Sequence, residues 1–221
     1  MNHLTAQPLP DWDTVIVTDI GAAGSKGVPR AQREQQILDA AADEFGRYGY
    51  AGAALSAIAS AAGVSKQLVL SYFGSKDGLY VACVERAGRN LIVPIEQAIS
   101  GERGPIGTAD DTLAAIFTAL EPRPHDWNVI NDRTPPTGGR AHAAARGVRT
   151  AIAGQAARGI AGLSELDYLK PEDVSLLTDV WMSTVTALVR WWLRHPEQPA
   201  AEMIQRSRRI FAALNMIDNE K

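Results

Sequence analysis

Polar and basic side chains gather in residues 65–76, which read SKQLVLSYFGSK, and their types suit contact with nucleic acid. Lysine can neutralise a phosphate, glutamine can pair with an adenine edge, and leucine can contact a thymine methyl group. A serine that opens such a stretch can cap a helix, because its hydroxyl accepts a hydrogen bond from a first-turn amide. The candidate DNA contacts in this stretch are Ser65, Lys66, Gln67, Leu70 and Ser71.

Two short apolar-periodic segments surround the turn before these residues, and they predict a helix-turn-helix. The first covers about residues 55–62 and ends at Gly63, since glycine adopts the left-handed conformation of a helix C-cap without a steric penalty. The second covers about residues 66–72 and ends at Gly74-Ser75. Two short helices joined by a glycine-containing turn of about 3–4 residues form this DNA-binding motif.

A preceding helix is expected over residues 29–48, with Ile37, Ala41 and Phe45 on its buried side. Arg30 stands at the amino end of this helix, where it can reach a phosphate. A solvated surface charge is an equal alternative for Arg30.

Patterns typical of catalysis or metal binding are missing from the sequence. It contains no phosphate-binding glycine loop, no zinc-ligand spacing and no nucleophile elbow. None of the four histidines is paired with a cysteine or an acid at the spacing of metal ligands. We therefore expect no enzymatic activity, no catalytic residue, no metal and no cofactor.

The distribution of charge favours the same DNA-binding segment. Net charge is −3 for the whole chain, but residues 26–90 carry eight basic and six acidic side chains and are net positive. The single cysteine, Cys83, lies in an apolar pattern, which predicts a buried structural thiol. No run of about 18 apolar residues and no signal peptide occurs, so we expect a cytoplasmic protein.

Alanine-rich composition and repeated 3–4 spacing of apolar residues predict an all-α fold with three parts. Residues 1–28 are expected to be a mobile N-terminal extension, 29–90 a helix-turn-helix DNA-binding domain, and 91–221 a larger helical domain for ligand binding and dimerisation. Further helices are predicted at about 75–90, 95–100, 108–120, 140–162, 171–195 and 199–216, with a loop or broken helix at 121–139.

Aromatic and soft apolar side chains in the larger part can line a pocket for a small, mostly apolar effector. Each of them is also a plausible core residue. The candidates are Phe117, His125, Trp127, Trp181, Met182 and Trp191.

The last two helices carry apolar residues on more than one side, which one small bundle cannot cover. The simplest cover is the same pair of helices from a second copy. We therefore expect a homodimer with an isologous four-helix interface, formed by residues of about 171–195 and 199–216.

The string from Gln35 through Leu79 resembles the DNA-binding domain of the TetR (tetracycline-repressor) family of bacterial transcriptional regulators. The resemblance implies a dimeric, ligand-responsive regulator, most often a repressor, that binds a palindromic DNA operator. It also implies that Tyr72 and Lys76 contact the DNA backbone. The matching residues are Ile37-Leu38, Ala40-Ala41, Glu44-Phe45-Gly46, Gly49-Tyr50, Ile58-Ala59, Ala61 through Lys66, Tyr72-Phe73, Ser75-Lys76 and Leu79.

Three positions depart from that family pattern. The family usually has threonines where this chain has Ala53 and Ala54, and a tyrosine where it has Leu70. These changes remove hydroxyls that cap a helix or contact phosphate. They motivate an alternative function, a helical dimerisation or adaptor protein whose helix-turn-helix no longer binds DNA.

Overall fold

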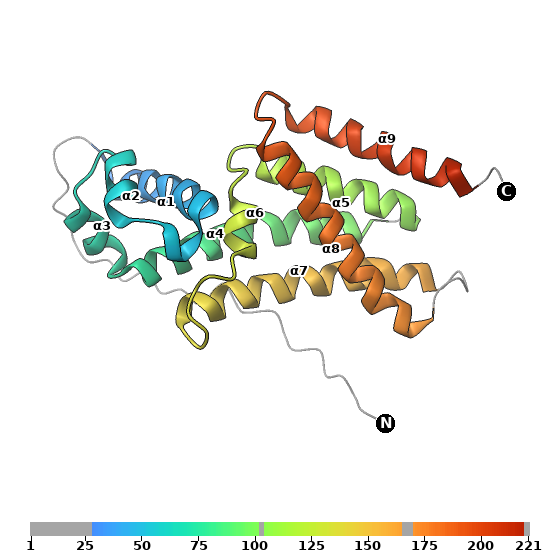
Figure 1. Ribbon diagram of the computed structural model, residues 1–221, viewed down its shortest axis with the longest axis horizontal. Coiled ribbons are helices and arrows are strands. Elements are labelled where there is room, and N and C mark those ends of the chain that lie inside the picture. The colour runs from blue at the N-terminus through green and yellow to red at the C-terminus, as the bar shows by residue number, and fades with distance from the viewer. Residues whose placement is uncertain (1–27, 102–103, 165–169, 219–221) are drawn as a thin grey trace.

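The computed structural model describes residues 28–101, 104–164 and 170–218, and these ranges form helices without strands, as the sequence predicts. Figure 1 shows the first three helices gathered at one end of an elongated molecule and the last two helices toward the other. The helices are α1 (Arg30–Gly52), α2 (Leu55–Ala61), α3 (Lys66–Phe73), α4 (Lys76–Ile99), α5 (Pro105–Leu120), α6 (Asp126–Asn131), α7 (Arg140–Ser164), α8 (Pro171–Leu193) and α9 (Ala200–Asp218).

The first three helices pack around a small core that their apolar spacing predicts. Ile37, Ala41 and Phe45 of α1 are buried, and Ile58 of α2 and Val69 of α3 pack in the same core. The turn between α2 and α3 passes through Gly63 in the left-handed conformation, with φ of 64°. The helix-turn-helix therefore forms where the sequence places it.

The fourth helix is longer than the sequence predicts. It continues without a break past Asn90 and through Pro94 to Ile99. Its first turns pack against α1 and α3, and its later turns pack against α5 and α7. Packing on both sides outweighs the hydrogen bond that Pro94 removes from the helix. The expected end near residue 90 is wrong, and the proposed division between residues 90 and 91 falls inside this helix.

The segment 121–139 contains α6, a helix of six residues. Figure 1 places it between the two ends of the molecule. It packs against α1, α4 and α7. The helix before it, α5, begins at Pro105 rather than at the predicted Thr108, because Pro105 occupies its first turn after Gly104. The expected extension, residues 1–28, lies almost entirely outside the described residues.

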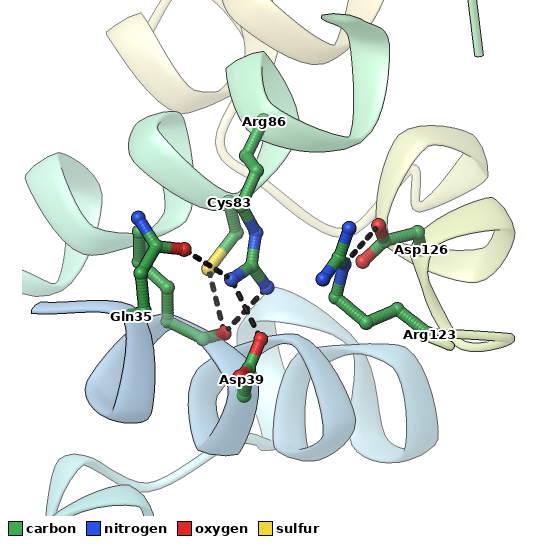
Figure 2. Close-up of polar contacts among 7 residues, drawn as sticks. Gln35, Asp39, Cys83, Arg86, Arg123 and Asp126 are labelled. Carbon is green, nitrogen blue, oxygen red and sulfur yellow. Dashed lines mark hydrogen bonds and ion pairs between the residues drawn. The ribbon is translucent and has the colours of Figure 1, made fainter. Parts of the chain in front are cut away.

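A buried arginine connects α4 to α1, as Figure 2 shows. The Nη1 atom of Arg86 lies 2.7 Å from Oδ1 of Asp39, and its Nη2 atom donates to the carbonyl of Leu38 at 3.0 Å. Nη1 also donates to Gln35 at 3.3 Å. The Arg86 side chain is only 8% exposed, whereas the Asp39 side chain is 55% exposed, so a buried guanidinium pairs with a carboxylate at the surface.

A second charged pair lies on the α6 side of the same region (Figure 2). The Arg123 Nε atom is 3.4 Å from the buried carboxylate of Asp126. Burial raises the pKa of Asp126, while the charges of Arg86 and Arg123 lower it. Cys83, also in this region, is completely buried, which confirms the predicted structural thiol. Burial raises the pKa of that thiol far above its usual range.

We predict that Arg86→Ala destabilises the fold by about 3 kcal/mol, because it removes the three hydrogen bonds of a buried guanidinium and leaves the buried Asp126 with less compensation for its charge. Urea unfolding followed by circular dichroism measures this change. Arg89→Ala is the matched control, since Arg89 is exposed on the same helix and its loss should change stability by less than about 0.5 kcal/mol. Equal unfolding midpoints for the two variants would contradict the prediction.

Candidate nucleic-acid interface and apolar cavity

The α3 helix presents a polar face to solvent. An N-cap and one buried side chain hold the helix in its orientation. Ser65 accepts a hydrogen bond from the Leu68 amide at 3.1 Å, which makes it the N-cap. Val69 is buried in the hydrophobic core. Lys66, Gln67 and Ser71 are exposed. The helix can therefore offer these three side chains to a partner without disturbing the core.

Other candidate contacts border this face. Leu70 is half-buried, and its side chain follows Gln67 by three positions on the same helix. The guanidinium of Arg30 lies over the ring of Tyr72, 5.2 Å from its centroid. This cation–π contact joins the start of α1 to the end of α3, so both residues lie at the edge of the exposed face.

The lysine at position 76 is engaged inside the protein. Its Nζ atom donates to the carbonyl of Ala53 at 2.6 Å and lies 4.9 Å above the ring of Tyr50. The Tyr50 hydroxyl donates to Asp77, and this hydrogen bond, with burial, raises the pKa of Tyr50 to about 12. Lys76 therefore holds the segment that leads into α2, a role that the sequence comparison with the family did not suggest.

The same segment contains the two alanines that replace capping residues. Ala54 is the N-cap of α2 and has no side-chain hydroxyl. The Glu44 carboxylate of α1 accepts the amide of Ala54 itself, at 3.1 Å, and so holds the backbone at this helix end. With Lys76 on the Ala53 carbonyl, side chains from α1 and α4 thus hold the backbone at both alanines. Glu44 lies ten residues before Ala54 in the sequence, and only the tertiary fold brings its carboxylate to the Ala54 amide. Sequence spacing therefore does not reveal this contact.

The segment that follows α6 is hydrogen-bonded to the end of α1. Asp132 accepts the amide of Tyr50, and the Thr134 hydroxyl accepts the amide of Ala51 at 3.0 Å. Gly49, just before these amides, has a φ of 69°, and a Cβ there would lie 3.2 Å from the Thr134 hydroxyl. The turn that precedes α2 is therefore fixed by residues that lie more than eighty positions later.

A cavity of about 200 Å³ lies among α4, α5, α6, α7, α8 and α9. None of the side chains that line it is charged, and most are apolar. The hydroxyls of Thr112 and Thr184 in its wall donate to backbone carbonyls at 2.7 and 2.9 Å. The cavity therefore suits an uncharged, apolar group.

Three of the six predicted ligand contacts line this cavity: Trp127, Trp181 and Met182. The indole of Trp181 stacks on Phe211 of α9, which also lines it. Contact of these residues with a ligand stays a prediction.

The other three predicted ligand residues lie elsewhere. Phe117 packs edge-on against Trp192 at 5.4 Å, and Trp191 stacks on His195 at 3.8 Å. His125 lies between α6 and α1, with its Nε2 atom 3.4 Å from the Asp43 carboxylate, and burial lowers its pKa. Their residue types suit either a cavity wall or a packing contact, and sequence spacing does not separate the two.

Neither a metal centre nor a membrane span is found where the structure is described. Among residues 28–101, 104–164 and 170–218, no three side chains of metal-ligating type gather into one group. No helix in these ranges is long and apolar enough to cross a membrane.

Residues 37–83 match the family model described as bacterial regulatory proteins of the tetR family. The HTH-type transcriptional activator FasR of Mycolicibacterium smegmatis is 40% identical over 94 residues, which cover 42% of this chain and 40% of FasR. The chain thus matches about two fifths of the length of this curated relative.

Similarity to solved structures extends over most of the chain. PfmR of Thermus thermophilus superposes with a TM-score of 0.64 at 18% identity, covering 81% of this chain and 94% of PfmR. FadR of Bacillus subtilis, solved in complex with stearoyl-CoA, gives a TM-score of 0.57 at 17% identity, covering 77% of this chain and 95% of FadR. At these identities the likeness shows a common fold.

We predict that Ala54→Ser stabilises the protein by about 1 kcal/mol, because it supplies the missing N-cap hydroxyl at an exposed position with extended backbone. Thermal unfolding followed by circular dichroism measures the gain. Ala57→Ser is the control: it adds the same hydroxyl inside α2, where serine lowers helix stability slightly. A stabilisation of both variants, or of neither, would contradict the predicted N-cap hydrogen bond.

Proposed function

Because the chain belongs to the TetR family of bacterial regulatory proteins, we propose that it is a ligand-responsive transcriptional repressor, bound as a homodimer to a palindromic operator and released by a small, mostly apolar effector. The observation that carries the proposal is the combination of two features in one chain. An exposed polar face lies on the second helix of a helix-turn-helix, and an uncharged cavity lies in the helical part behind it.

In this proposal α3 enters the major groove of DNA. Lys66 contacts phosphate, while Gln67 and Ser71 face base edges, where glutamine can bind adenine. Leu70 adds apolar contact with a thymine methyl group. Ser65 and Lys76 position the motif rather than specify sequence, and Arg30 and Tyr72 lie near the backbone. Two copies would bind half-sites about 34–36 Å apart.

The proposed dimer forms through α8 and α9. Leu176 and Val180 of α8 are 66% and 51% exposed, and Ile210 of α9 is 42% exposed. Large apolar side chains at this exposure favour burial against another surface. A second copy of the same two helices would cover all three, which supports an isologous four-helix interface.

The proposed effector occupies the cavity and acts on the DNA-binding end through α6. Trp127 of α6 lines the cavity, while Asp132 and Thr134, just after α6, hold the amides of Tyr50 and Ala51. An effector that prefers one arrangement of α6 would thereby favour one orientation of the helix-turn-helix. Linkage then requires DNA to weaken effector binding by the same factor.

The replaced hydroxyls at Ala53, Ala54 and Leu70 raise the alternative of a helical adaptor protein without DNA-binding activity. The contacts of Glu44 and Lys76 argue against it, because they hold the backbone at both alanines. Selection of bound fragments from a genomic DNA library separates the two functions. Recovery of a near-palindromic sequence supports a repressor, and the absence of any enriched sequence supports an adaptor.

We predict that Lys66→Ala weakens binding to the selected operator and flattens its dependence on salt. One phosphate contact contributes a slope of about 0.9 in log K against log salt, so a dimer should lose roughly 1.8. Fluorescence anisotropy at several salt concentrations measures both quantities. Lys170→Ala, at an exposed lysine before α8, is the control and should bind as wild type does. An unchanged salt slope for Lys66→Ala would show that Lys66 does not contact the DNA.

We predict that Asp132→Ala uncouples the effector from DNA, because it releases the Tyr50 amide from the segment after α6. Wild-type protein should leave the operator when a hydrophobic ligand from a panel is added. The variant should bind the same ligand within about threefold, since Asp132 does not line the cavity, but need a higher ligand concentration for release. Operator shift assays and calorimetry measure release and binding separately.

Thr137→Ala is the control for this experiment, since Thr137 is exposed in the same loop. It should respond to the ligand as wild type does. Full release of the Asp132→Ala variant at the wild-type ligand concentration would show that this contact carries no signal.

A further inference from the structure

A second pocket lies directly beside the apolar cavity and has the opposite chemistry. It is lined by residues from the end of α6, from α7 and from α8, among them three arginines, Arg133, Arg149 and Arg190. Asp179 is the one acidic side chain in its lining, so the formal charge of the lining is +2. Its volume is about 690 Å³, and it opens to solvent.

The positive charge of the three arginines is only partly compensated by other protein groups. Within the described residues, neither Arg133 nor Arg190 forms an ion pair. Arg149 uses its Nη1 atom to donate to the carbonyls of Ile130 and Asp132, at 2.8 and 3.0 Å. These carbonyls fix the guanidinium in place without neutralising it. Burial, followed by the like charge of Arg133, lowers the pKa of Arg149, and the opposite charge of Asp132 only partly offsets this. An anion in the pocket would relieve this crowding of positive charge.

Only a thin wall separates the arginine pocket from the apolar cavity. Met182 lines both. The Trp127 indole, in the cavity wall, donates to the hydroxyl of Thr186, in the pocket wall, at 3.3 Å. Methionine has three rotatable bonds and adapts its shape easily, so Met182 can move aside without a change of backbone.

We propose that the effector of this regulator is an amphipathic anion, with its apolar chain in the cavity and its carboxylate or phosphate bound by Arg133, Arg149 and Arg190. This inference rests on the proposed function, since it names the chemical class of the effector. The cavity supplies apolar contact but no charge. The pocket supplies guanidinium groups, which bind carboxylates and phosphates through paired hydrogen bonds. One molecule that spans the wall at Met182 would satisfy both.

Two classes of molecule carry an apolar chain and an anionic headgroup, and their headgroups differ. A fatty acid offers a carboxylate, and an acyl thioester of coenzyme A offers phosphates beyond its acyl chain. Decanoate and decanoyl-CoA serve as the two anionic probes, and 1-decanol is the neutral probe with the same chain. Isothermal titration calorimetry on the full chain measures the affinity for each.

Wild-type protein should bind at least one anionic probe roughly tenfold more tightly than 1-decanol. The double variant Arg133→Gln/Arg190→Gln should lose this preference and keep its affinity for 1-decanol. It leaves Arg149, which holds the loop carbonyls, in place. The double variant Arg146→Gln/Arg194→Gln removes the same charge from exposed positions outside the pocket and should keep the preference.

Tight binding of decanoate alone assigns a carboxylate to the pocket, and tight binding of decanoyl-CoA alone assigns a phosphate. Equal affinity of wild-type protein for all three probes, no binding of any probe, or an equal loss in both double variants would overturn the inference. Release of the selected operator by 1-decanol as readily as by the anions would overturn the anion site while leaving the proposed repressor function intact. Failure to bind any selected DNA would overturn the proposed function itself.

Discussion

One continuous helix has to serve both ends of this molecule. The first turns of α4 close the core under the helix-turn-helix, and its last turns form one wall of the apolar cavity. Neither end can rotate about the helix axis independently of the other. At Gly88 the helix approaches α7 so closely that a Cβ would lie 2.9 Å from a methyl group of Val148. This close contact and the Arg86 ion pair fix α4 against its neighbours on two sides.

The helix-turn-helix shows how tertiary contacts can hold a helix end whose N-cap residue has no hydroxyl. A hydroxyl at the N-cap is the local way to satisfy the first amides of a helix. Here a carboxylate from α1 and an ammonium from α4 hold the backbone of Ala53 and Ala54. The start of α2 consequently depends on the packing of α1 and α4. A shift of α4 relative to α1 would reach the DNA-binding face directly, through the Lys76 ammonium.

The sequence predicts well those features that depend on neighbouring residues. Periodic apolar positions identified the buried side of α1, and Gly63 with Ser65 located the turn and the N-cap, because each is a local conformational preference. Pro94 shows the limit: its local effect predicts a break, but contacts with α5 and α7 carry the helix through it. The cavity shows a second limit. Trp127 lines it and Phe117 does not, although both are buried aromatic residues in apolar segments.

The α6 helix is the part of the molecule whose shape depends most on what surrounds it. Isolated helices shorter than about 12–15 residues are marginal in water, so a helix of six residues forms only through its packing. One side of α6 meets the cavity through Trp127, and the carboxylate of its first residue, Asp126, pairs with Arg123 beside the buried Arg86. Asn128 donates to the carbonyl of Gly46 in α1 at 3.0 Å. A ligand that fills the cavity therefore changes the support of a short helix that is bonded directly to α1, and its differential affinity for the two arrangements of α6 limits how far it can shift the DNA-binding end.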